Sequence, residues 1–428
     1  MEDPRPFAVH GSEKMIYDVR MGPQCLCRDG TFWVAYLANP DGDKALPHII
    51  RRDLHGTWLD PVVLGDVACY DHHFAPVLWF DAAEHIHVLY HCHSGLDEAR
   101  HLVSAAPLDC ARWTDAPPIA PSISYPRLLR CPDSELVLYY RALGHLGFWT
   151  YRVSDDGGHS WVQPTRSHVD FDLFPEAPGD EWAGSYHSVA LARDGRSLHV
   201  AFVYWDERDR PHPLYGRKVG HMNRYNLYYL RLDVLSGRIF TVDGKSLDLP
   251  LNRRNAGACL VLDTEEHLSN MPSVLVDEDD SPCFLVPLSE DAIDNCRFCF
   301  IRRTGDQWTR STVTETSSTW NGSHMEFGHD GSITAFLIGK AANVGDRPYG
   351  GGPLQEWRST DHGASWRHIV DITPQPALLC NNPKPIENVD GSLLKRSLVF
   401  FGWEGPDGIL PNVPFKGRAY LWQDGKWL

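Results

Sequence analysis

Two eight-residue segments, far apart in the chain, share a pattern of four fixed residues. Ser154–Trp161 reads SDDGGHSW and Ser359–Trp366 reads STDHGASW, so both fit Ser-x-Asp-x-Gly-x-x-Trp. Serine and aspartate side chains accept hydrogen bonds from the backbone amides of a tight turn, and glycine permits the positive φ that such turns require. The tryptophan can pack its indole between neighbouring sheets. The repeat therefore predicts two similar hairpin turns and an architecture of repeated β units.

Short hydrophobic segments with strand-like alternation make up most of the chain, and helical periodicity is almost absent. The clearest lie at residues 31–37, 85–90, 135–141, 198–204, 227–232 and 397–402. Glycine, aspartate, asparagine and proline separate them, which is typical of many short strands joined by turns. This pattern predicts an all-β fold.

The repeated motif is identified as the Asp-box, also called the BNR repeat, which marks β-propellers. Weaker turns of a similar type end at Trp58, Trp113, Trp308 and Trp427, and Leu235–Ile239 resembles one more. Together they give seven blade ends, at positions 58, 113, 161, 239, 308, 366 and 427, which are 48 to 78 residues apart. We therefore predict a seven-bladed β-propeller, with eight blades as the alternative, in which Trp161 and Trp366 are buried at equivalent places.

A single domain over residues 1–428 is expected, because no linker or change in composition divides the chain. The longest interval between blade ends contains polar inserts at about residues 166–185 and 206–222. We expect both inserts to form loops over one mouth of the propeller. Loops that close one end of a groove there would favour exo action on short chains.

The charge of the chain limits its partners. The sequence has 40 lysines and arginines against 56 aspartates and glutamates, which gives a formal net charge of −16, and no long basic run occurs. Nucleic acid and membrane are therefore not expected as partners. An anionic substrate would need local cationic side chains, because the overall field of the protein repels it.

The cysteines and the first residues of the chain indicate the cellular compartment in which the protein is expected. The 11 cysteines are scattered, many of them in strand-like segments, which favours buried free thiols in a reducing compartment. The acidic, proline-rich start at residues 1–6 does not resemble a signal peptide. We expect a cytoplasmic protein if the chain is complete, and a secreted or periplasmic one if a signal was removed.

A dense group of histidines is the main chemical feature of the sequence. His73 and His93 lie twenty residues apart, and Tyr125 and Arg141 follow with a spacing of sixteen. Imidazole, phenol and guanidinium groups are those needed to take a proton from a carbon beside a carboxylate, which requires a cation on the carboxylate and a nearby base. The same residues could instead have structural roles. The histidines could cluster by chance, the Tyr125 ring could pack in the core, and Arg141 could form an ion pair at a blade edge.

This region resembles the BNR-repeat polysaccharide lyases, of the ulvan-lyase type and the related rhamnosyl-glucuronate lyases. These lyases share a pattern that begins with a His and an Asp eight residues later, followed by a Leu-His-Val strand and a Met-His pair. This chain aligns with the pattern without a gap, and the matching residues are His73, Asp81, His87 and His93. Their later blocks match Tyr125-Pro126, Tyr140-Arg141 and Ser185-Tyr186. The resemblance covers roughly residues 60–290. The two-residue period of a strand would place His85, His87 and His93 on the same face. Not all of them can contact a substrate, so we predict that His87 is structural.

The resemblance implies a lyase that cleaves a rhamnose–glucuronate or similar uronate linkage by β-elimination. Arg141 would clamp the carboxylate, and Tyr125 would protonate the leaving oxygen or act as base in its phenolate form. His73 or His93 would be a second donor or the base. Substrate-binding roles fall to Arg141 and to four further residues: Tyr186, His187, Arg224 and Tyr225. The implied partner is an anionic, uronate-containing oligosaccharide or polysaccharide.

Two positions depart from the family pattern and leave the exact sugar open. Phe74 stands where the family often has Asn, and Tyr225 stands where many members have His. No cofactor is required for the implied chemistry. A structural metal, zinc or calcium, is compatible with the resemblance, but the sequence does not give a full ligand set.

Two other classes of function remain open on the sequence. One is a propeller glycoside hydrolase, either a rhamnosidase or a sialidase-like enzyme. A sialidase usually carries an Arg-Ile-Pro-like segment near its start, which this chain lacks. The other is a non-catalytic propeller that binds a protein or a glycan, since this fold supports many functions.

Overall fold

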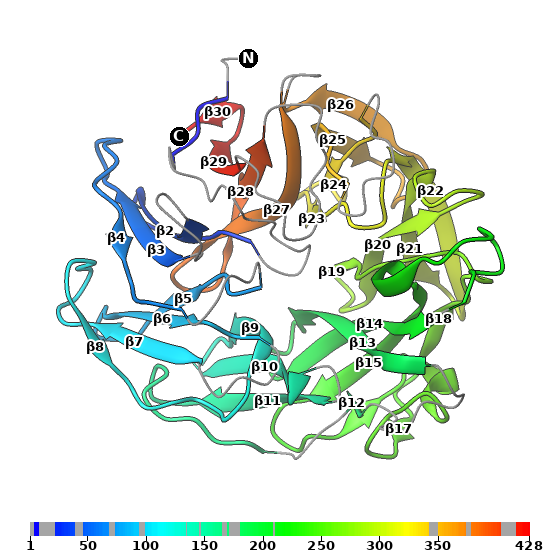
Figure 1. The fold of residues 1–428 in the computed structure, drawn as a ribbon, viewed down its shortest axis with the longest axis horizontal. Coiled ribbons are helices and arrows are strands. Elements are labelled where there is room, and N and C mark those ends of the chain that lie inside the picture. The colour runs from blue at the N-terminus through cyan, green and yellow to red at the C-terminus, as the bar shows by residue number, and fades with distance from the viewer. Residues whose placement is uncertain are drawn as a thin grey trace.

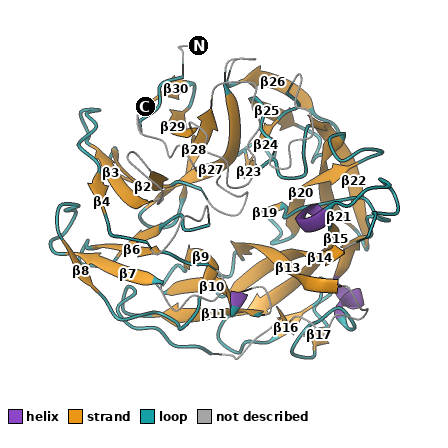
Figure 2. Cartoon of the chain, viewed as in Figure 1, coloured by secondary structure: helices purple, strands orange, loops and turns teal. Residues whose placement is uncertain are grey.

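A computed structural model of the chain describes residues 4–7, 22–38, 46–67, 73–93, 99–133, 135–144, 147–164, 169–170, 180–208, 210–341, 350–373, 378–403 and 417–428. Within these ranges the fold is all-β, as predicted, and β-sheets surround a central axis in a β-propeller-type arrangement (Figures 1 and 2). Short 3₁₀ turns occur at η2 (Gly220–Met222) and η3 (Ala256–Cys259). No helix in the described part of the chain is long and apolar enough to cross a membrane.

Five sheets follow one another along the chain, and consecutive strands within each pair antiparallel. The first contains β5 (Val77–Phe80), β6 (Ile86–Tyr90), β7 (Arg100–Ser104) and β8 (Trp113–Asp115). The second contains β9 (Ser124–Arg130), β10 (Leu136–Ala142), β11 (Phe148–Ser154) and β12 (Val169–Asp170). The third contains β13 (Asp180–Leu191), β14 (Ser197–Arg208), β15 (Arg224–Asp233), β16 (Ile239–Phe240) and β17 (Ser246–Leu247), and β18 (Leu260–Leu262) pairs with β15. The fourth contains β19 (Ser273–Val276), β20 (Pro282–Ser289), β21 (Cys296–Thr304) and β22 (Gln307–Thr316), and the fifth β23 (Ser323–Phe327), β24 (Ile333–Ile338), β25 (Leu354–Ser359) and β26 (Arg367–Asp371).

An eight-stranded sheet joins the two ends of the chain, in the order β30-β29-β28-β27-β1-β2-β3-β4. Its N-terminal half is β1 (Gln24–Arg28), β2 (Thr31–Ala38), β3 (Leu46–Arg52) and β4 (Val62–Val63). Its C-terminal half is β27 (Leu379–Asn388), β28 (Leu393–Trp403), β29 (Gly417–Gln423) and β30 (Lys426–Trp427). The halves meet where β1 and β27 pair in parallel, through Leu26 with Glu387 and Cys27 with Asn388, so the first strand of the chain lies beside the first strand of the C-terminal half (Figure 1).

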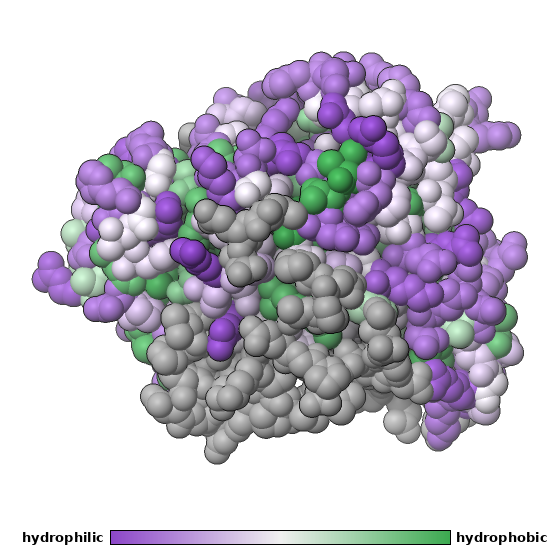
Figure 3. Space-filling view, turned by 90° about the horizontal axis from the view of Figure 1, so that it is seen from above, coloured by the Kyte–Doolittle hydropathy of each residue, from purple (hydrophilic) through white to green (hydrophobic). Residues whose placement is uncertain are grey.

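The six predicted strand segments are confirmed, in β2, β6, β10, β14, β15 and β28. Their hydrophobic content is high because both faces of the central strands are covered by neighbouring sheets. In β10, for example, every residue from Leu136 to Ala142 is buried. On the face shown in Figure 3, most of the described surface is hydrophilic, so the large apolar side chains lie mainly between the sheets.

Both Asp-boxes form the predicted turn, one after β11 and one after β25. In the first, Gly158 N donates to Ser154 Oγ (2.8 Å) and Ser160 N donates to Asp156 Oδ1 (2.9 Å). The second box repeats both bonds at the same lengths, from Gly363 N to Ser359 Oγ and from Ser365 N to Asp361 Oδ1. The sequence motif therefore encodes one local structure at two places.

The two motif tryptophans occupy equivalent places, as predicted, but they are only partly buried, which corrects the prediction that they are buried. Trp161 packs edge-on against Trp79 of the preceding sheet (centroids 6.1 Å apart), and Trp366 packs similarly against Phe300 (5.3 Å). The Asp-box joins the outer strands of a sheet, so one face of the indole meets the neighbouring sheet and the rest faces solvent.

The structure describes the two predicted inserts to different extents. Most of the insert at 166–185 lies outside the described residues, apart from β12 and the start of β13. The insert at 206–222 begins at the end of β14 and ends in η2. Asp206, which is fully buried, accepts hydrogen bonds from Asn223 and Tyr225, so this insert is tied to the start of β15.

Candidate active site

The four predicted catalytic residues come from two neighbouring hairpins. His73 precedes β5 and His93 follows β6, while Tyr125 is near the start of β9 and Arg141 near the end of β10. In an antiparallel hairpin, the start of the first strand and the end of the second lie at the same edge. Each hairpin thus presents two of the four residues at one edge, and contacts between the hairpins bring all four to the same mouth of the propeller.

His73, His93 and Tyr125 are in direct contact. The two imidazole rings stack, with centroids 3.8 Å apart and an interplanar angle of 18°. Tyr125 packs edge-on against His73 (5.5 Å), and its hydroxyl lies 3.2 Å from His93 Nε2, within hydrogen-bond distance. A proton can therefore pass between the phenol and this imidazole.

The backbone at this cluster departs from regular strand geometry. Tyr125 has a φ of +55° and lies at a register shift between β9 and β10, and His91 has a φ of +63° just after β6. Residues other than glycine adopt these values at a cost, and such positions concentrate at functional sites. The bulge turns the Tyr125 side chain towards the histidines.

Arg141 supplies a buried cation beside Tyr125. Its side chain is fully buried, and its Cζ lies 4.6 Å from the Tyr125 ring centroid and 5.3 Å from that of Tyr186. Among the described residues, no acceptor bonds its Nε, Nη1 or Nη2. The alternative of a blade-edge ion pair is therefore not observed. A desolvated guanidinium with unused donors has a strong preference for an anionic ligand such as a carboxylate.

A second buried arginine lies next to the first. Arg224, at the start of β15, has its Cζ 4.5 Å from the Tyr186 ring and 4.2 Å from the Trp320 ring. Tyr186 therefore lies between two guanidinium groups, which is consistent with a site for an anionic chain. The sequence analysis missed Trp320, because a lone tryptophan before a strand has no signal that separates it from a core residue.

His187 and Tyr225 have other neighbours. His187 stacks on Trp149 (4.2 Å, 11°), and its ring nitrogens lie 2.6 Å from the Tyr139 hydroxyl and 2.8 Å from Ser185 Oγ. Tyr225 donates to Asp206 Oδ2 (3.0 Å). In these positions His187 supports the Trp149 ring and Tyr225 anchors the insert at 206–222, while their proposed contacts with substrate stay predictions.

A cavity of about 370 Å³ lies along the inner strands of several sheets, next to the cluster. Tyr125 and His187 line it, together with Arg127 of β9 and Glu387 of β27. Burial raises the pKa of Glu387 and lowers the pKa of Arg127. Tyr125 therefore borders both the histidine pair and this cavity.

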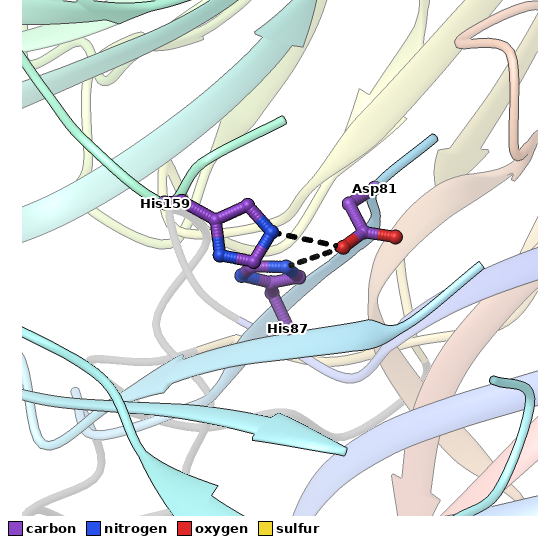
Figure 4. A group of neighbouring side chains, drawn as sticks. All are labelled: Asp81, His87 and His159. Atoms are coloured by element: carbon purple, nitrogen blue, oxygen red, sulfur yellow. Dashed lines mark hydrogen bonds and ion pairs between the residues drawn. The ribbon is translucent and has the colours of Figure 1, made fainter. Parts of the chain in front are cut away.

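Asp81 and His87 form a different group, although they match the same block of the lyase pattern. β6 ends at Tyr90 and the positive φ of His91 breaks the alternation, so the prediction that His87 and His93 share a strand face is wrong. His87 instead lies 3.5 Å from Asp81, which also contacts His159 at 3.0 Å (Figure 4). This group includes no member of the candidate active site.

The fold and the site together define a β-propeller protein with a buried, cationic and aromatic site at one mouth. A model of the BNR repeat-containing family matches residues 31–316. The chain therefore belongs to this family.

Individual relatives are similar to the chain at low identity. The ulvan lyase of Alteromonas sp. (strain LOR) is 24% identical over 281 residues, which cover 58% of this chain and 56% of that protein. The ulvan lyase of Nonlabens ulvanivorans is 23% identical over 317 residues, 69% of this chain and 64% of that protein. The chain thus matches less than two thirds of the length of these curated relatives. A solved PL25 ulvan lyase bound to -[GlcA(1-4)Rha3S]- aligns with a TM-score of 0.75 and 19% identity, over 98% of this chain and 95% of that one, which establishes a shared fold.

Proposed function

We propose that the protein is a polysaccharide lyase that cleaves a rhamnose–glucuronate or similar uronate linkage by β-elimination. The observation that carries this proposal is Arg141, a fully buried guanidinium with no acceptor among the described residues, beside the Tyr125–His93 pair. The likeness to ulvan lyases supports the reaction class.

In the proposed reaction, the uronate carboxylate takes the donors of Arg141. Neutralising this charge makes the C5 proton more acidic and stabilises the enolate that forms when the proton leaves. Tyr125, His93 or His73 removes that proton, the C4–O bond breaks and a C4–C5 double bond forms. The leaving oxygen receives a proton, and the short Tyr125–His93 contact supports Tyr125 as its donor.

Arg224 is proposed to bind a further part of the anionic chain. Its guanidinium lies between the rings of Tyr186 and Trp320, and both rings offer flat surfaces on which a sugar can stack. The substrate partner is therefore an anionic polysaccharide, more specifically one that contains uronate. An enzyme that acts on such a polymer would need to be exported, whereas one acting on imported oligosaccharides would remain in the cytoplasm.

A direct assay distinguishes the three functional classes. The protein is incubated with glucuronate–rhamnose polymers, sulfated and unsulfated, while ultraviolet absorbance and reducing ends are recorded. Elimination produces an ultraviolet-absorbing unsaturated uronate with each new reducing end, whereas a hydrolase produces reducing ends without that absorbance. A binding module produces neither. New reducing ends without absorbance on every polymer would contradict the lyase proposal.

The proposed architecture is a single domain of seven blades. The eight-stranded sheet is then two blades, β1–β4 and β27–β30, each of them antiparallel. Support comes from the contact between the two halves, which is parallel and limited to two residue pairs. The other five sheets are one blade each.

A further inference from the structure

The insert at 206–222 contains an exposed basic turn outside the candidate active site. Residues 210–218 read RPHPLYGRK, with three cationic side chains and no aspartate or glutamate. Arg210, Arg217 and Lys218 are all exposed. Because the chain as a whole has a formal net charge of −16, this turn is a local region of opposite sign that can attract an anion.

Contacts within the turn give it a defined shape. The His212 amide donates to the Arg217 carbonyl oxygen (2.8 Å), and the Gly216 amide donates to the His212 carbonyl oxygen (2.9 Å). His212 is buried, and its ring stacks on Tyr215 (4.7 Å, 27°). Arg210 and Lys218 therefore leave the two arms of one closed turn. A turn that is already ordered loses less conformational freedom when a ligand binds.

The turn lies at the same mouth of the propeller as the candidate active site. The hydroxyl groups of Tyr215 and Ser289 form a hydrogen bond, and Ser289 is the last residue of β20. β20 is the second strand of its sheet, as β10 is of the sheet that contains Arg141, which lies near the end of β10. Equivalent strand ends of successive sheets meet at one mouth, so the turn covers the boundary between the third and fourth sheets there.

The basic turn continues a series of cations that starts in the candidate active site. The guanidinium groups of Arg141 and Arg224 both lie beside the Tyr186 ring, at 5.3 Å and 4.5 Å from its centroid. Lys218 is six residues before Arg224 in the sequence, so their Cα atoms are at most about 22 Å apart. An anionic polymer carries charges at repeated intervals, and a chain of several sugars can therefore reach from Arg141 past Arg224 to the turn.

We propose that the turn at residues 210–218 is a distal subsite for an anionic polysaccharide. Arg210, Arg217 and Lys218 bind carboxylate or sulfate groups of sugars that lie beyond those at the candidate active site. This inference rests on the proposed function for its class of substrate. A single exposed ionic contact contributes little. Contacts along one polymer add up, because the chain is already held at the active site, so the subsite favours long chains over short ones.

The test compares the affinity for a long and a short ligand after the charge of the turn is reversed. The Kd of a sulfated glucuronate–rhamnose polymer and that of a tetrasaccharide of the same repeat are measured by calorimetry, in a Tyr125→Phe background that should not consume them. Arg210→Glu/Lys218→Glu should raise the Kd of the polymer roughly tenfold. The Kd of the tetrasaccharide should change by less than about twofold, because at about 0.15 M salt the effect is confined to direct contacts. With the turn unaltered, the polymer Kd should depend more steeply on salt than the tetrasaccharide Kd.

Arg112→Glu/Arg367→Glu is the matched control, since it makes the same change of net charge. Both arginines are exposed and lie in turns between the third and fourth strands of their sheets, at the edge away from the candidate active site. This control should keep the polymer Kd. An unchanged polymer Kd after reversal in the turn, an equal loss in the control, or an equal loss for the tetrasaccharide would overturn the inference. Affinity is measured apart from turnover, so charge-dependent polymer binding without any elimination by the wild type would contradict the proposed function alone.

Discussion

At the scale of single residues, the candidate site combines a buried cation with an unusual backbone conformation. Among the residues that the structure describes, the buried Arg141 has no acceptor, and Tyr125 has a backbone conformation that is unfavourable for its residue type. Both features are unfavourable for the stability of the protein alone, and the proposed function gives them a role in binding an anionic substrate. Mutations here should therefore separate activity from stability.

Replacing Tyr125 by Phe should reduce kcat by about two to four orders of magnitude while substrate binding persists. Only the hydroxyl that contacts His93 is removed, and the ring still packs against Arg141. Steady-state kinetics with ultraviolet detection measure this effect. Tyr140→Phe is the control, because that hydroxyl contacts Arg152. Near-normal elimination in Tyr125→Phe would leave the histidines as candidates for the base.

Replacing Arg141 by Met should leave the Tm unchanged or raise it, because the guanidinium has no acceptor to lose among the described residues. The same change should reduce kcat/KM by at least about 100-fold, since the carboxylate loses its clamp. Arg141→Lys should recover only part of the activity, because an ammonium group lacks the planar pair of donors. A strongly lowered Tm with normal kinetics would show that Arg141 is a structural residue.

At the scale of elements, the Asp-box is a turn that depends on an ionised aspartate. In the second box, Asp361 accepts bonds from the Ser365 amide (2.9 Å), the Ser365 hydroxyl (2.6 Å) and the Ser359 hydroxyl (2.8 Å). These bonds lower the pKa of Asp361 to about 2 from its usual value near 3.8. The charged form is therefore the one that stabilises the turn.

This shift predicts a dependence of stability on pH. Because the pKa of Asp361 is lower in the folded state, its contribution is fully present above about pH 4 and is lost as pH falls towards 2. Asp361→Asn should lose stability near neutral pH and show a smaller change between pH 4 and pH 2. Thermal unfolding at several pH values measures both effects. Asp155→Asn, at a variable position of the first box, should behave like the wild type.

At the scale of the whole molecule, charged contacts link sheets that are consecutive around the axis. Arg396 of β28 forms an ion pair with Glu356 of β25, and its Nε donates to Asp424 Oδ1 (2.7 Å). The Glu356 side chain is only 4% exposed. This contact therefore connects the last two sheets of the chain across a partly dry interface.

Arg396→Ala should lower the free energy of unfolding by about 1–3 kcal/mol, because it leaves the Glu356 carboxylate buried without its cation. Adding Glu356→Gln should recover part of this loss. Arg358→Ala is the comparison, since its partner Asp330 is 60% exposed, and should cost less than about 1 kcal/mol. Denaturant unfolding measures all three variants. Equal losses in Arg396→Ala and Arg358→Ala would contradict the idea that burial of Glu356 matters.

Features that depend on neighbours in the chain could be predicted from the sequence. The Asp-box turns are an example, because every bond that defines them lies within eight residues. The strand segments are another, since each needs only a local hydrophobic pattern. The set of His73, His93, Tyr125 and Arg141 was predicted through ordered blocks that resemble a known family, and the structure brings these four residues together.

Only the tertiary structure determined which side chains from different sheets meet. Asp81 and His159 are 78 positions apart and touch because the β5–β6 turn packs against the first Asp-box. Trp320 contacts Arg224 in the same way, across sheets. Strand periodicity alone misplaced His87 and His93 on one face, because the strand ends between them at a residue with positive φ. Local patterns specify the strands and turns, whereas contacts between sheets depend on how the strands close around the axis.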